Sequence, residues 1–171
     1  VSDSVFLSSL GQNYYSAAIN QKNNDSQLNV ILDTISSYPG SSYKYLLEPM
    51  SNLVFQQAQA GNISFSDSLS KIVVKLAQKS KDSSLYAACL QDRGLVFWIG
   101  GQLDSARQYF QTTKDIAIHT NNIEQIISSR LNLALINQHQ VSFEKTVKEL
   151  EKLIDLSEKN EKWGFMASAC N

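Results

Sequence analysis

A sequence pattern that returns every 40 residues limits the folds that this chain can adopt. Glycine occupies positions 61 and 101, and apolar residues recur at Tyr15, Phe55, Leu95 and Leu135. A period of this length corresponds to one supersecondary unit that cannot bury its apolar faces alone, so successive units must stack. We therefore expect a single repeat domain over 1–171, with repeats at about 1–40, 41–81, 82–121 and 122–161 and a partial fifth at 162–171.

The repeating unit is predicted to be a pair of helices. Only two prolines and seven glycines interrupt the 171 residues, which favours helix over most of the chain. Apolar residues at 147, 150, 153 and 154 have helical spacing, and Lys and Glu lie between them. Turn-forming residues at 38–40, 120–122 and 158–160 separate the repeats. The predicted helices span 3–21, 25–37, 42–60, 65–80, 83–100, 103–119, 123–140 and 143–158, with another from about 161.

The third repeat carries the most specific motif. A bulky residue, a glycine, an aromatic, a turn glycine, an alanine and a second aromatic follow one another as Leu90, Gly94, Phe97, Gly101, Ala106 and Phe110. In order and spacing this stretch resembles the tetratricopeptide repeat. The resemblance implies an all-α superhelix of about four stacked helical hairpins plus a partial fifth, in a variant longer than the commoner 34-residue repeat.

The first repeat fits this pattern least well. Asn13 and Asp33 occupy positions where members of the family usually carry apolar groups. We therefore expect its helices to be displaced or bent relative to the other three pairs.

Composition narrows the classes of partner. The net charge is −1 and the pI is about 6.1. No basic patch of the kind that binds nucleic acid is visible in the sequence, so we expect no nucleic-acid partner. No apolar run approaches the ~18 residues of a membrane span. The chain opens with Val1 and shows no signal peptide, so we expect an excised piece or processed product whose membrane attachment, if it has one, lies in other segments.

The sequence offers no constellation for catalysis. The two histidines, His119 and His139, lack neighbouring ligands at metal-binding spacing, and the glycine pair at 100–101 fits a hairpin turn better than a phosphate loop. The cysteines, Cys89 and Cys170, fall about two repeats apart, too far for a disulfide if helices stack ~8–10 Å apart. We expect no enzyme activity, no metal and no cofactor.

The resemblance also implies a binding surface. In tetratricopeptide arrays the first helix of each pair lines a concave groove that holds peptides or partner segments. When the groove positions of the family are transferred to the aligned repeats of this sequence, the groove-facing residues are Tyr15, Phe55, Gln59, Gln91, Leu95, Trp98, Leu131, Leu135, Gln138 and His139. The alternative is that Tyr15, Phe55, Leu95 and Leu135 pack first helix against first helix, and the two interpretations are evenly balanced for Trp98. The paired Lys and Asn residues that clamp a carboxylate terminus in some family members are missing.

These features lead to a functional hypothesis. Charged residues make up only 18% of the chain, and its richness in Ser, Asn and Gln is typical of exported bacterial domains. The helical pairs resemble the N-terminal sensor regions of bacterial membrane signalling proteins of the histidine kinase or diguanylate cyclase type. We expect a periplasmic interaction module that binds a protein or peptide segment, with a small ligand or a homodimer as further options. The alternatives are a cytoplasmic regulator, like the pheromone receptors or transcription activators, and a pure assembly scaffold.

Overall fold

The fold is described from a computed structural model, which defines residues 3–19, 25–137, 143–162 and 164. These residues form helices and turns and contain no strand. In chain order the elements are α1 (Asp3–Ile19), α2 (Asp25–Ile35), the short 3-10 helix η1 (Gly40–Ser42), α3 (Lys44–Gln59), α4 (Ile63–Ser80), α5 (Ser83–Ile99), α6 (Leu103–His119), α7 (Ile123–Asn137) and α8 (Phe143–Lys159). The all-α prediction is confirmed, and the predicted helix ends lie within about three residues of the observed ones wherever those ends are described.

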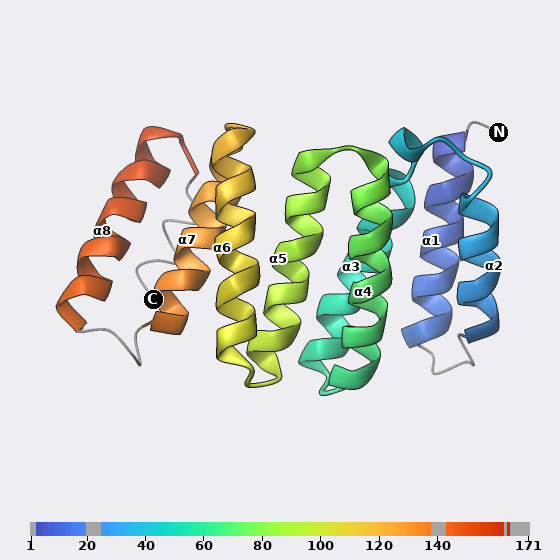
Figure 1. Cartoon of the computed structure of the whole chain (residues 1–171), viewed down its shortest axis with the longest axis horizontal. Coiled ribbons are helices and arrows are strands. Elements are labelled where there is room, and N and C mark those ends of the chain that lie inside the picture. Colours follow the sequence, from blue (N-terminus) through green and yellow to red (C-terminus); the bar gives the residue numbers. More distant parts are fainter. Residues whose placement is uncertain (1–2, 20–24, 138–142, 163, 165–171) are drawn as a thin grey trace.

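The helices form four hairpins stacked in a row from the N-terminus to the C-terminus (Figure 1). The first helices of successive hairpins contact one another in order, from α1 to α3, α3 to α5 and α5 to α7. Each second helix from α4 onward also packs on the first helix of its own hairpin, and α4 and α6 pack on the next. The expected partial fifth repeat at 162–171 falls almost entirely outside the described residues.

The turns explain why the hairpins stack so regularly. Left-handed residues occur at Gly61 (φ 87°), Lys81 (φ 60°), Gly101 (φ 77°), Asn121 (φ 51°) and Glu161 (φ 58°). The connection between α2 and α3 has no left-handed residue, but from Gly61 to Glu161 one falls every 20 positions, alternately within and between hairpins, apart from 138–142, which lie outside the described residues. Each ends a helix with a backbone conformation that glycine adopts most easily. Equal turns joining helices of similar length generate the 40-residue period.

Small residues allow the helices of a hairpin to approach closely. Ser66 and Ala106, one period apart, are both fully buried. Gly94 lies so close to the ring of Phe110 that a Cβ placed there would come within 2.6 Å of the ring atom Cε1. Side chains from successive hairpins fill the space between them, and the largest buried cluster runs from α1 to α5.

The first hairpin departs from the repeat in which of its positions are buried. Asn13 and Asp33 are exposed, and the neighbouring residues Tyr14 (2% exposed) and Ile31 (2% exposed) supply the buried groups instead. α1 therefore uses a register shifted by about one residue. It packs mainly against α3, and its contact with α2 is slight.

Candidate interaction surface

A hollow of about 510 Å³ opens between α3 and α5, the first helices of the second and third hairpins. Because these two helices contact each other directly, the hollow lies on the face formed by the first helices. Its lining comes from one side of each helix and comprises Lys44, Tyr45, Leu47, Glu48, Ser51, Asn52, Leu85, Ala88, Cys89 and Asp92.

The hollow combines an apolar floor with one partly buried carboxylate. Leu47 is completely buried and Cys89 is 2% exposed. Asp92 lies three residues after Cys89, and its carboxylate accepts a short hydrogen bond from the Ser51 hydroxyl on α3. Residues three apart share a helix face, so Cys89 and Asp92 present their side chains to the same space.

Burial controls the protonation of both groups. Burial raises the pKa of Asp92 to about 6, although the hydrogen bond from Ser51 opposes this shift. Burial, together with the nearby charge of Asp92, raises the pKa of the Cys89 thiol to about 12. The thiol is therefore protonated near neutral pH and is a poor nucleophile. The hollow is suited to holding a group with apolar surface and a hydrogen-bond donor.

Polar side chains on this face also link one first helix to the next. The Tyr15 hydroxyl donates to Gln56 Oε1 at 2.6 Å, and the Ser128 hydroxyl donates to Gln91 Oε1 at 2.9 Å. The Gln125 amide donates to the Ser84 carbonyl at 2.7 Å. Together with the Ser51–Asp92 hydrogen bond, these contacts tie all four first helices together. Part of the polarity of this face therefore serves the stacking of the hairpins.

The predicted groove residues are distributed among packed and open positions. Leu131 is only 7% exposed and belongs to a buried cluster between α7 and α8. Leu95 packs beside Phe110, and Trp98 contacts the same ring edge-on with centroids 6.2 Å apart. Partly buried positions are occupied by Tyr15, Phe55, Gln91, Leu95, Trp98 and Leu135, and Gln59 is exposed. Gln138 and His139 lie outside the described residues.

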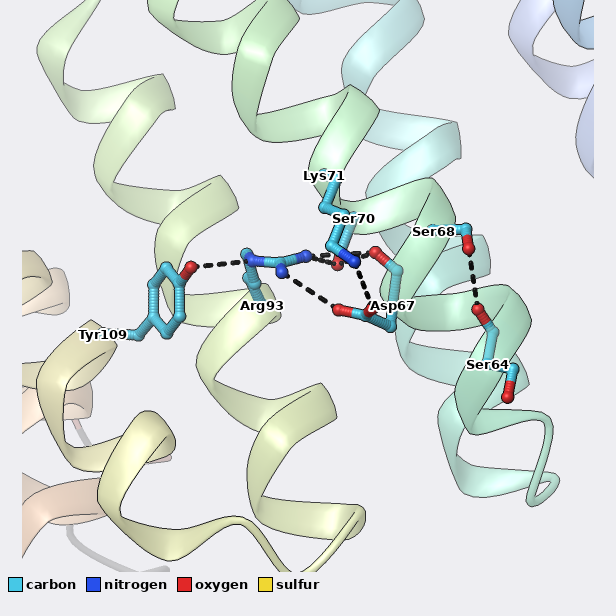
Figure 2. A network of polar contacts seen from close by, with 7 residues as sticks. All are labelled: Ser64, Asp67, Ser68, Ser70, Lys71, Arg93 and Tyr109. Atoms are coloured by element: carbon cyan, nitrogen blue, oxygen red, sulfur yellow. Dashed lines mark hydrogen bonds and ion pairs between the residues drawn. The ribbon is translucent and has the colours of Figure 1, made fainter.

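A network of polar contacts that the sequence did not suggest is centred on Arg93 (Figure 2). Arg93 is 6% exposed and its guanidinium pairs with the Asp67 carboxylate at 2.9 Å. It also donates to the Ser70 hydroxyl at 2.5 Å and to the Tyr109 hydroxyl at 2.9 Å. One side chain of α5 thus joins α4 to α6. The sequence contained one sign of this cluster. The positions 40 residues before and after Arg93 are both leucine (53 and 133), so an arginine at this point of the repeat is unusual.

Electrostatics in this cluster stabilise the charged forms. Burial opposes ionisation of Asp67, but hydrogen bonding from Lys71 and the charge of Arg93 outweigh it and hold the pKa of Asp67 below its usual value. The Arg93 guanidinium also lies 4.9 Å from the Phe97 ring centroid. A buried guanidinium with this many partners acts as a cross-link between helices. Its donors are occupied within the protein, so we assign it a structural role.

The histidines and cysteines are the remaining candidate groups from the sequence. His119 is exposed, and its ring Nδ1 lies 3.3 Å from the Asp115 carbonyl oxygen of its own helix. Cys89 is buried with a free thiol, and Cys170 lies outside the described residues. Within the described part of the chain, no three His, Cys, Asp or Glu side chains gather in a way that could hold a metal ion. No helix among these residues is long and apolar enough to cross a membrane.

Comparison with known proteins finds no family model that matches this sequence. A search of curated proteins likewise gives no match.

Proposed function

We propose that this chain is a non-catalytic interaction module that binds a protein or peptide segment on the face of its first helices. The observation that carries the proposal is the hollow between α3 and α5, where an apolar floor surrounds the Asp92 carboxylate. An apolar pocket with a few polar groups that fix orientation is the usual design of a binding site. A segment that inserts an apolar side chain bearing a donor, such as a lysine stem or a tyrosine, matches this lining.

The stack of hairpins supports a signalling role for such binding. Successive hairpins contact one another both through their first helices and through the packing of α4 on α5 and of α6 on α7. The hollow lies at one of the junctions between first helices. A ligand that fits one curvature of the stack better than another would shift the population toward that curvature. We propose that the chain serves in this way as the extracytoplasmic sensor region of a bacterial signal-transduction protein, the role suggested by its sequence resemblance.

Peptide selection against the immobilised chain tests the binding proposal. The matched variants are Ala88→Gln, which places a longer side chain in the hollow, and Thr112→Gln at an exposed position of α6. We expect selected peptides to bind the wild type and Thr112→Gln equally, and to bind Ala88→Gln at least about tenfold more weakly. Selected peptides that bind all three proteins equally would refute the assignment of the hollow.

The signalling part of the proposal has its own test. The complete gene should encode a membrane anchor before this region, and a further membrane span with a kinase or cyclase output after it. A DNA-binding domain adjoining this region would favour the cytoplasmic regulator instead.

A further inference from the structure

A second surface lies along α7, in the C-terminal part of the stack. Two hollows, of about 340 Å³ and 300 Å³, share the lining residues Ala134, Asn137 and Glu149 and therefore adjoin. They extend between α6 and α8, with α7 as the floor. Among the described residues α8 packs on α7 but makes no contact with α6, and Figure 1 shows α6 and α8 standing apart. We call the two hollows together the α6–α8 groove.

Positive charge is concentrated in the α6–α8 groove. Six of the 15 cationic side chains of the protein line it, against one of its 16 acidic ones. The six are Arg107, Lys114, Arg130, Lys145, Lys148 and Lys152. In a chain of net charge −1, the lining of this groove therefore carries an excess of cations over acids, which favours acidic ligands.

Pairing within the protein neutralises part of this charge, because four of the six cations have a carboxylate at ion-pair distance: Arg107, whose partner is Asp104, and Arg130, Lys148 and Lys152. Glu149 is shared by Arg130 at 3.0 Å and Lys152 at 2.8 Å, and hydrogen bonds from Lys152 and Arg130 hold the pKa of Glu149 below its usual value. Lys148 pairs with Glu144 at 3.0 Å, but the Glu144 side chain is 79% exposed, so solvent weakens that pair. Within the described chain, Lys145 has no acidic partner at ion-pair distance.

A buried donor in the same groove also lacks a partner. Thr146 lies in the first turn of α8 and is 7% exposed, and its hydroxyl makes no hydrogen bond to any described residue. Two periods earlier, the equivalent Ser66 donates to the Val54 carbonyl at 2.5 Å. An unsatisfied buried hydroxyl is costly, and this one lines the groove at the positive end of a 17-residue helix.

We propose that the α6–α8 groove binds an acidic, extended segment of a partner protein. The cations form two rows rather than one cluster: positions 145, 148 and 152 follow one face of α8, and positions 107 and 114 follow one face of α6. Carboxylates spaced along an extended strand would meet both rows, whereas a single phosphate would reach only a few of these cations. This site is separate from the hollow between α3 and α5.

Fluorescence anisotropy with a labelled eight-residue peptide of alternating Glu and Gly tests this proposal. The test variant is Lys145→Gln/Lys152→Gln. Its control, Lys75→Gln/Lys79→Gln on exposed positions of α4, removes the same charge. We expect binding that weakens with salt, about tenfold loss in the test variant and no loss in the control. No binding, or equal loss in both variants, would overturn the proposal.

Two further measurements identify the occupant and the role of the hydroxyl. Thr146→Val keeps the shape of the side chain, and we expect it to weaken peptide binding severalfold while leaving the melting temperature unchanged or raised. Inorganic phosphate or a single-stranded RNA that competes as well as the Glu peptide would exclude the acidic segment as the specific occupant. Ala88→Gln should bind the Glu peptide like the wild type, which separates this result from the first proposal.

Discussion

Replacement of Gly94 by alanine tests whether α5 and α6 pack so closely at this position that a side chain there is unfavourable. The added methyl group would come within 2.6 Å of Phe110 Cε1 and 2.8 Å of Cδ1. Phe110 is fully buried and Trp98 lies against its edge, so the ring has little room to move away. Overpacking of this kind costs about 1–3 kcal/mol, and alanine returns ~1 kcal/mol through helix propensity.

We therefore expect Gly94→Ala to lower the free energy of unfolding by about 1 kcal/mol, and Gly94→Leu by roughly 3 kcal/mol. Urea denaturation followed by circular dichroism measures both values. A double-mutant cycle provides the control. In a Phe110→Leu background the clash with the ring is removed, so Gly94→Ala should become neutral or stabilise by up to ~1 kcal/mol. If alanine has the same effect in both backgrounds, the proposed contact with Phe110 is wrong.

Three other substitutions test separate parts of the structure. Arg93→Ala should destabilise the protein by about 3 kcal/mol in urea denaturation, because Asp67 loses its buried partner. The remaining ion pair with Lys71 limits the loss. A loss below ~1 kcal/mol would contradict the cross-linking role of Arg93. Because the pKa of Asp92 is raised to about 6 in the folded protein, the folded state binds more protons between about pH 4 and 6, and stability falls as pH rises through that window. Asp92→Asn should flatten this part of the wild-type melting curve against pH, and an unchanged slope would assign the pH dependence to other groups. Lys81→Gly should raise the melting temperature by about 1–3 °C, since glycine relieves the left-handed conformation; a lower melting temperature would mean that the Lys81 side chain stabilises the turn.

The helices and their stacking could be predicted because local signals and the repeat agree. Turn glycines at 61 and 101 fix the period, and small residues such as Gly94 and Ala106 fix where two helices meet. For the first hairpin, the sequence predicted only that it would differ from the other three, without indicating how. The one-residue shift that buries Tyr14 in place of Asn13 depends on packing between α1 and α3, which the spacing within either helix does not reveal.

The sites were harder to predict because they depend on juxtaposition across hairpins. The register pointed to the first-helix face as a binding surface, which stays a prediction, and it could not show that Asp92 would meet Ser51 41 residues away. The α6–α8 groove was missed because its cations are dispersed in sequence from 107 to 152 and mixed with acids. Local charge counts indicated no basic patch, whereas the fold brings these cations together along two helices.

NMR chemical-shift mapping with a selected peptide tests directly whether peptides bind in the hollow between α3 and α5. In a ¹⁵N-labelled sample, we expect the largest shifts on peptide addition at the amides of Ser51, Ala88 and Asp92, which surround this hollow. Shifts confined to the second helices α2, α4 and α6, with no change at these three amides, would contradict it.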